Sequence, residues 1–266
     1  MSSILEAPGQ QSACCVQATQ AQLQVAVWNL NHRVGMTAFQ PQAPAAAMAL
    51  DTDVLVFNEF YPGKHESFFL GQLADAGWHH QQLSADTGEK ANRVLVASRV
   101  PIEPMALTLP SFDRQFPANI AAVLVPSIGV KLIGLRVPMY QKATAGLLPR
   151  AWDWLENTAH ALVNQPVVMV GDLNTSIHAT GSRLRPQFQR ILASGWRRAE
   201  PADGPSYFGT NGATSEIDHV LHTQHIGVTG ARFVRTVGGY SLAGRSGAMS
   251  DHAALCFSIR LVDDLT

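Results

Sequence analysis

The chain has 266 residues, 46% of them hydrophobic and 15% charged, and its formal net charge is −1. It is long enough to bury a sizeable core, as one large domain or two small ones. The near-neutral total gives no overall basic field for nucleic acid, although one basic face can lie within it. Its three cysteines are too few for a disulfide framework and show no metal-ligand spacing.

The sequence contains neither a membrane span nor a secretory signal in the usual form. No apolar run reaches the roughly 18 residues of a spanning helix, and the N-terminus lacks a basic region followed by an apolar one. We therefore expect a cytoplasmic protein. Residues 2–22 are rich in Gln, Ala and Ser, which predicts a disordered tail over 1–22 and one domain over 23–266.

The first half of the chain alternates short apolar runs with helical patterns. The runs predict strands at 23–29, 54–57, 93–98, 120–125 and 130–137. Helices are expected at 37–50, which is Ala-rich, and at 65–76, which is amphipathic. The last two strands flank Pro126-Ser127-Ile128-Gly129, so we expect them to form a hairpin.

The second half continues the mixture. Residues 149–163 give the clearest helical pattern, with Pro149 in the first turn and apolar residues at helical spacing. A second helix is expected at 185–193, and strands at 167–170, 217–221 and 253–261. Strands in pairs with helices between some of them favour two sheets with covering helices over a strictly alternating βαβ fold.

Several of the apolar strands end in polar side chains. The strand at 167–170 runs into Gly171-Asp172-Leu173-Asn174, where the carboxylate and amide at i and i+2 leave the strand on one side. Similar polar groups close or open the other strands: Trp28-Asn29, Asn58-Glu59, Glu216-Ile217-Asp218-His219 and Ser250-Asp251-His252. If these ends converge, they form an oxygen-rich cluster with a histidine.

Few chemistries use such a cluster. Carboxylate oxygens suit Mg²⁺ or Mn²⁺, which typically keep several waters and accept phosphate oxygens as further ligands. A carboxylate can position or deprotonate an attacking water, and an imidazole backed by an aspartate can donate to a phosphate oxygen. The set therefore fits metal-assisted hydrolysis of a phosphoester.

The five motifs, in this order, resemble the endonuclease/exonuclease/phosphatase superfamily, which includes DNase I, exonuclease III-like enzymes, neutral sphingomyelinases and inositol-polyphosphate 5-phosphatases. The resemblance extends from Leu23 to Leu261. It implies an α/β (α+β) fold of the DNase I-like kind: a four-layer α/β sandwich with two mostly antiparallel sheets face to face and helices outside.

The resemblance also implies a role for each residue. Metal binding would fall to Glu59 as principal ligand, completed or supported by Asn29 and Asp251. Asp172 would handle the attacking water, and Asn174 would bind the water or the scissile phosphate. His252 would bind the phosphate, and Asp218 would orient His252. By strand alternation Asn31 shares a face with Asn29, and we favour Asn29 as the inward residue.

One position departs from the family pattern. Many members place His or Tyr after the middle strand, in contexts like Thr-His-Leu or Tyr-Val-Pro-Asn, whereas here Arg136 precedes Val137-Pro138-Met139. Arginine can bind a phosphate but is no general acid at neutral pH. Phosphate binding survives this change, whereas proton transfer at that position does not follow from the resemblance. The missing Asn after Val137-Pro138 also argues against a standard abasic-site endonuclease.

The substrate class is less constrained than the chemistry. Two segments carry arginines without nearby carboxylates, around 183–198 and 232–245, and Tyr240 lies in a glycine-rich loop where it can stack on a base or sugar. These features favour a Mg²⁺- or Mn²⁺-dependent nuclease that cleaves DNA or RNA by in-line attack of an activated water. The alternatives are a phosphatase or phosphodiesterase for a small phosphorylated metabolite or lipid head group, and a non-catalytic binding module.

Overall fold

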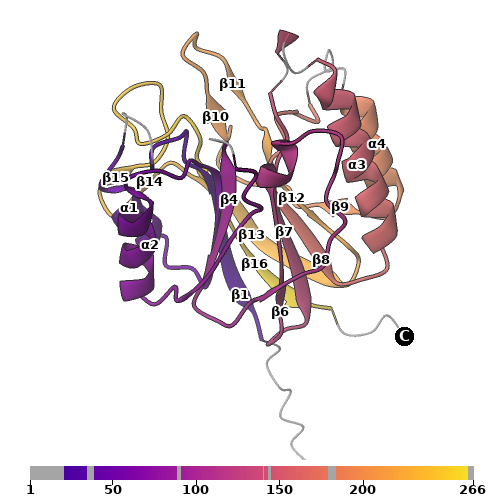
Figure 1. The fold of residues 1–266 in the computed structure, drawn as a ribbon, viewed down its shortest axis with the longest axis horizontal. Coiled ribbons are helices and arrows are strands. Elements are labelled where there is room, and N and C mark those ends of the chain that lie inside the picture. Colours follow the sequence, from indigo (N-terminus) through magenta and orange to yellow (C-terminus); the bar gives the residue numbers. More distant parts are fainter. Residues whose placement is uncertain are drawn as a thin grey trace, which may run out of the picture.

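Two six-stranded sheets stack face to face, with helices against both outer faces (Figure 1). The computed structural model describes residues 21–34, 39–88, 91–139, 141–142, 145–178 and 184–262. Nearly all of the predicted N-terminal tail lies outside these residues. The predicted four-layer α/β sandwich is confirmed.

The first sheet is mainly antiparallel. Its strands, in spatial order, are β13 (Ile226–Val234), β16 (Ala254–Leu261), β1 (Leu23–Asn29), β2 (Val54–Phe60), β4 (Arg93–Ser98) and β3 (His80–Leu83). Only β1 and β2 among the paired strands of this sheet run parallel. Their connection contains α1 (Ala43–Met48), as a parallel pair requires a crossover.

The second sheet repeats this plan. Its order is β5 (Glu103–Pro104), β6 (Ile120–Val125), β7 (Val130–Arg136), β8 (Val167–Asp172), β12 (Asp218–His222) and β9 (Arg197–Arg198). The strands β6 and β7 form the predicted hairpin. Strands β7 and β8 are parallel, and their crossover contains α3 (Leu147–Leu162).

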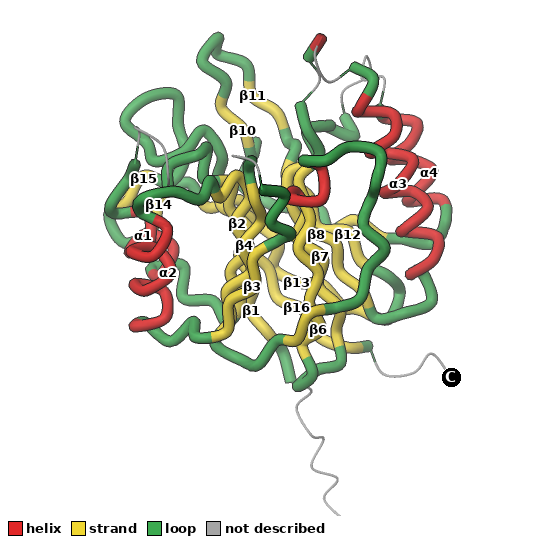
Figure 2. Tube along the Cα trace, viewed as in Figure 1, coloured by secondary structure: helices red, strands yellow, loops and turns green. Residues whose placement is uncertain are grey.

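Helices cover the two outer faces (Figure 2). The first sheet is covered by α1 and α2 (Glu66–Asp75), and the second by α3 and α4 (Arg185–Ala193). A short 3₁₀ turn, Phe116–Asn119, precedes β6. Two small hairpins complete the fold: β10 (Tyr207–Phe208) with β11 (Thr214–Ser215), and β14 (Thr236–Val237) with β15 (Tyr240–Ser241).

Side-chain alternation explains why the central strands are apolar throughout. In β1, Val25 and Val27 face the core between the sheets, whereas Ala26 and Trp28 pack toward α1 and α2. Because both faces of each sheet are covered, a central strand buries every side chain, as the seven residues of β2 do. The strands are therefore short continuous apolar runs, which made them recognisable in the sequence.

Several elements differ from prediction: β2 extends to Phe60, and the short strands were not predicted. The helix expected at 37–50 is confined to Ala43–Met48, with Pro44 in its first turn, while residues 37 and 38 lie outside the described ranges. Strand β13 was not predicted, because most of its residues are partly or fully exposed and its pairing is interrupted by a register shift between Thr229 and Arg232.

Candidate active site

The inward-facing rows of the central strands end in polar residues. In β8, Val168 and Val170 belong to the core between the sheets, and Asp172 continues their row. Asn29 continues the corresponding row of β1. Alternation extends the same face to three further positions at neighbouring strand ends: Asn58, Arg136 and Asp218. The polar residues thus collect at one end of the space between the sheets.

Asp172 is the centre of this group and is almost fully buried. Its Oδ1 accepts the backbone N–H of Asn174 at 2.8 Å, and its Oδ2 accepts the side-chain amide of Asn174 at 2.9 Å. From the opposite sheet, Asn29 Nδ2 donates to the same Oδ2 at 3.1 Å. These contacts fix the carboxylate, while burial raises the pKa of Asp172 to about 7.

His252 and Asp218 form a buried pair beside Asp172. Asp218 lies opposite Asp172 in the β8–β12 register, and its Oδ2 is 2.8 Å from His252 Nδ1. Burial alone would lower the pKa of His252, but the charge and hydrogen bond of Asp218 raise it to about 10. The imidazole is therefore charged at neutral pH, and its Nδ1 is committed to Asp218.

This pairing predicts a pH effect. In an Asp218→Asn variant the negative charge facing His252 is gone, so the pKa of His252 falls and the imidazole loses its proton at lower pH. We expect the alkaline limb of the kcat/KM profile to move down by roughly 1–3 pH units. A rate profile from pH 6 to 11 measures this, and an unmoved alkaline limb would contradict the assigned pairing.

Glu59 reaches the cleft through a β-bulge. The β2–β4 register shifts between Phe57 and Phe60, and Glu59 has φ +52°. A bulge re-aims a side chain that strict alternation would direct to the outer face. Arg136 Nε and Nη2 both contact Glu59 Oε1, at 2.8 and 2.7 Å, and His32 Nε2 lies 2.9 Å from Oε2.

The electrostatics of Glu59 follow from these neighbours. Burial of the carboxylate raises its pKa, but the hydrogen bond from His32 and the charge of Arg136 outweigh burial and lower the pKa to about 2. Glu59 is therefore ionised over the whole physiological pH range, as a metal ligand must be.

Unusual backbone geometry is concentrated at this end of the sheets. Besides Glu59, three non-glycine residues of the site have φ between +46° and +60°: Asn31, His32 and Asn174. Such conformations cost about 1–3 kcal/mol each and cluster at functional sites. Asn174 uses its conformation to donate to both Asp172 and the carbonyl of Val137, at 2.8 Å.

Two buried contacts beneath the site were not predicted from the sequence: one between the sheets at Asn58, and one within the second sheet at Gly171. Asn58 is fully buried and bridges the sheets: its Nδ2 donates to Leu135 O, and its Oδ1 accepts from Asp172 N, both at 3.1 Å. Gly171 has φ +140°, and a Cβ there would lie 1.9 Å from Leu135 O. Asn58 shares its face with Val54 and Val56, so strand alternation was the signal for it.

Gly171→Ala is expected to destabilise the protein by about 3 kcal/mol or more, since the methyl group meets backbone and the φ is unfavourable. Gly71→Ala is the matched control, because Gly71 lies within α2 and has open space where an added methyl group would lie. Urea unfolding compares the two variants, and the control should be neutral or up to about 1 kcal/mol stabilised. A Gly171→Ala protein as stable as wild type would refute the packing argument.

A cleft of about 400 Å³ exposes the group to solvent. Its lining includes Glu59, Arg136, Asp172, Asn174, Asp251 and His252. It also includes Asn31, which the spacing left as the alternative to Asn29, and His32 and Tyr207, which were not predicted as site residues. Tyr207, in β10, is bridged to His252 through the backbone, and their ring centroids are 5.1 Å apart. No sequence pattern indicates Tyr207 as a site residue. It lies in the cleft because β10 runs beside the segment that precedes β16.

Two predicted residues lie elsewhere. Asn29 is buried behind the cleft: its Nδ2 supports Asp172, and its Oδ1 accepts from Asn31 N at 2.9 Å. Asn31 instead lines the cleft, and its Nδ2 donates to Asp251 Oδ1 at 2.9 Å. Tyr240 lines a separate pocket of about 480 Å³ with Arg33 and Met249.

The donor set of the cleft suits a hard divalent cation. Glu59 and Asp251 offer carboxylate oxygens and Asn31 an amide oxygen, the ligand types of Mg²⁺ and Mn²⁺. Glu59 also forms an ion pair with Arg136, so the guanidinium already compensates part of the negative charge that Glu59 would offer a metal ion.

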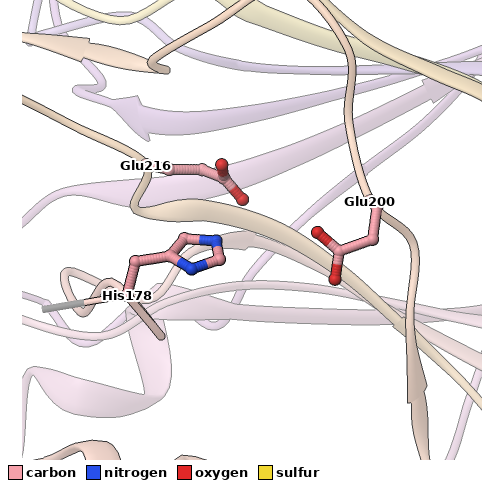
Figure 3. A group of neighbouring side chains, drawn as sticks. All are labelled: His178, Glu200 and Glu216. Carbon is pink, nitrogen blue, oxygen red and sulfur yellow. The ribbon is translucent and has the colours of Figure 1, made fainter.

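A second group of ligand-type side chains lies at the end of the second sheet. His178, Glu200 and Glu216 place one potential ligand atom each within 4.8 Å of one another (Figure 3). Arg198 accounts for the presence of both glutamates, because its buried guanidinium makes ion pairs with Glu200 and Glu216. Its Nε also donates to His219 Nδ1 at 3.1 Å. The carboxylates neutralise an arginine that is 3% exposed.

The two-sheet fold, a buried Asp–His pair and a cleft of oxygen ligands together define a metal-dependent hydrolase of phosphoesters. The model of the Endonuclease/Exonuclease/phosphatase family matches residues 26–252, and the chain belongs to this family. The family comprises divalent-metal-dependent enzymes. Among the described residues, no helix has the length and apolarity to cross a membrane.

Solved structures share the fold at low sequence identity. An endonuclease/exonuclease/phosphatase from Beutenbergia cavernae is 20% identical, with a TM-score of 0.68 over 90% of this chain and 72% of its own. A 3′ phosphatase, NExo, from Neisseria, solved with a product DNA hairpin, is also 20% identical, with a TM-score of 0.68 over 88% and 98%. An AP endonuclease from Archaeoglobus fulgidus is 17% identical, with a TM-score of 0.64 over 88% and 98%. A search of curated proteins gave no match.

Proposed function

We propose that this enzyme is a nuclease, which hydrolyses phosphodiester bonds of DNA or RNA with the help of Mg²⁺ or Mn²⁺. The observation that carries the proposal is the arrangement of Asp172, Asn174 and His252 in one open cleft, with Asp218 behind the imidazole. The Neisseria neighbour that shares the fold was solved with DNA.

In this proposal Asp172 takes a proton from the attacking water. Its carboxylate is fixed by Asn29 and Asn174, and a pKa near 7 suits a general base at neutral pH. Asn174 Nδ2 already donates to Asp172 and to the carbonyl of Val137, so its Oδ1 accepts a hydrogen bond from the attacking water. The attacking oxygen forms a bond to phosphorus in line with the leaving oxygen, the bond from phosphorus to the leaving oxygen breaks, and the leaving oxygen takes a proton from solvent water.

In this proposal His252, which lines the cleft together with Asp172, binds the phosphate. Its Nδ1 is committed to Asp218, so Nε2–H donates to a phosphate oxygen and stabilises the charge of the pentacoordinate state. Glu59, Asp251 and Asn31 would hold the divalent ion, which supplies electrostatic stabilisation of the phosphate charge when bound.

The surroundings of the cleft support a long polyanionic substrate. Of the arginines noted in the sequence, Arg190 and Arg198 are paired with glutamates, whereas two others contact the β10–β11 hairpin beside the cleft. Arg235 lies 5.9 Å from the ring of Phe208, and Arg245 donates to Gly212 O. The pocket with Tyr240 and Arg33 adds an aromatic ring and a cation, suited to a nucleotide beyond the scissile bond.

A substrate panel tests the proposal. Supercoiled plasmid, single-stranded DNA, abasic duplex, DNA with a 3′ phosphate and RNA are incubated with Mg²⁺, with Mn²⁺ and with chelator, beside inositol phosphates and sphingomyelin. We expect cleavage of at least one nucleic acid by the wild type, and none by His252→Ala or with chelator. If only the small phosphoesters or the lipid are hydrolysed, the nuclease proposal is wrong and the metabolite or lipid alternative holds.

A further inference from the structure

Both carboxylate oxygens of Glu59 have partners within the protein. Oε1 accepts from two nitrogens of Arg136, and Oε2 lies 2.9 Å from His32 Nε2. The side chains of Glu59 and Arg136 are only 12% and 15% exposed, so solvent weakens their pairing little. The carboxylate best placed to hold a divalent ion is thus already compensated by a cation.

The partners of Glu59 differ in how firmly they are held. Arg136 lies opposite Asp172 in the β7–β8 register, so its backbone is fixed by a central strand, and its charge persists at any physiological pH. His32 Nε2 is also 2.8 Å from Asn92 Nδ2. An amide nitrogen only donates and a carboxylate oxygen only accepts, so this ring nitrogen serves one of them at a time. His32 is therefore the exchangeable partner and Arg136 the permanent one.

We infer that Arg136 couples metal binding to substrate binding: it keeps the divalent-ion affinity of the free enzyme low, and a substrate phosphate raises that affinity by neutralising its guanidinium. This inference rests on the proposed function, because it takes Glu59 as the metal ligand. A divalent ion can take Oε2 when His32 Nε2 accepts from Asn92 instead of donating to Glu59, but the ion must then lie beside the charge of Arg136. A phosphate in the cleft, which Arg136 also lines, offsets that charge.

The coupling is reciprocal. If phosphate raises the affinity for the ion, the ion raises the affinity for phosphate by the same factor. Charges a few ångströms apart near a protein surface change an equilibrium constant by about tenfold or more. With Arg136 present, the divalent ion therefore binds more tightly with, or after, the substrate phosphate than before it.

Mn²⁺ titration calorimetry tests this, without and with a phosphorothioate dinucleotide that resists hydrolysis. Arg136→Gln is expected to bind Mn²⁺ about tenfold more tightly than wild type in the absence of the dinucleotide. The dinucleotide should tighten Mn²⁺ binding about tenfold in wild type and much less in the variant. Arg99→Gln is the matched control: it removes one positive charge from the opposite end of the first sheet, where Arg99 pairs with Asp51, and should behave as wild type.

The outcomes separate the inference from the proposed function. Equal or weaker Mn²⁺ affinity in Arg136→Gln overturns the inference. Should that variant fail to fold by circular dichroism, Arg136→Met supplies a second neutral side chain, to which the same criterion applies. Unchanged Mn²⁺ affinity in a Glu59→Gln variant would show instead that the ion does not bind Glu59, and the proposed metal site would be wrong.

Discussion

Replacing His252 by glutamine is expected to lower kcat by about 10²–10³-fold and to leave the protein folded. The imidazole is held at Nδ1 by Asp218, which keeps it charged and directs Nε2 to the cleft. Removing one preorganised donor to a developing oxyanion costs a factor of this size. Glutamine can still donate a hydrogen bond but carries no charge, so the loss reports on the charged donor.

The control for this variant is His79→Gln, because His79 is exposed and precedes His80, which lies at the end of the first sheet where β2 begins, opposite to Glu59. It should retain the wild-type kcat. Thermal unfolding of both variants separates a catalytic loss from a folding defect. A His252→Gln enzyme with kcat within about threefold of wild type would exclude His252 from transition-state stabilisation.

Strand alternation is the reason that much of the site was predictable from sequence. Asn29, Asp172 and Asp218 each extend a row of inward-facing apolar residues, so their direction follows from the period of two in a strand. The apolar runs themselves were visible because covered sheets bury both faces of a strand. Local sequence was therefore sufficient to predict both the strands and the polar residues at their ends.

The remaining features depend on contacts between distant segments. Glu59 lies in the cleft because a bulge interrupts alternation in β2. The sequence Val54-Leu55-Val56-Phe57 gives no sign of this bulge. Tyr207 reaches His252 through a backbone bridge, from a two-residue strand too short to show a pattern. Arg136 was predicted as a phosphate ligand, but its contact with Glu59 crosses from one sheet to the other.

Asn29 illustrates how alternation can identify a residue without fixing its role. Asn29 and Asn31 share a face by spacing, and the backbone turn after β1, with φ +46° at Asn31, sends them to different places. Asn29 remains in the strand and supports Asp172, while Asn31 lines the cleft beside Asp251. Left-handed conformations of this kind depend on the surrounding structure, so spacing alone could not separate the two asparagines.

Asp172→Asn is expected to reduce kcat by about 10²–10⁴-fold, the usual contribution of a positioned general base. The substitution keeps the shape of the side chain but removes its capacity to accept a proton. The amide oxygen of the replacement can still accept from the side chains of Asn29 and Asn174, but its NH₂ group then faces the backbone N–H of Asn174, which loses its acceptor. Because the proposed role of Asp172 is to act on the water and not to bind the substrate, KM should change less than kcat.

The pH profile distinguishes this role from a purely structural one. The pKa of Asp172 is raised to about 7 by burial, so its base form is lost as the pH falls through that value. Wild-type kcat should decline on the acid side of about pH 7, and the residual activity of Asp172→Asn should lack this limb because no carboxylate is left to titrate. Asp153→Asn, an exposed change on α3, should retain both the wild-type rate and the limb. If Asp172→Asn keeps the acid limb, another group supplies the base, and Asp172 serves to position the ligands around it.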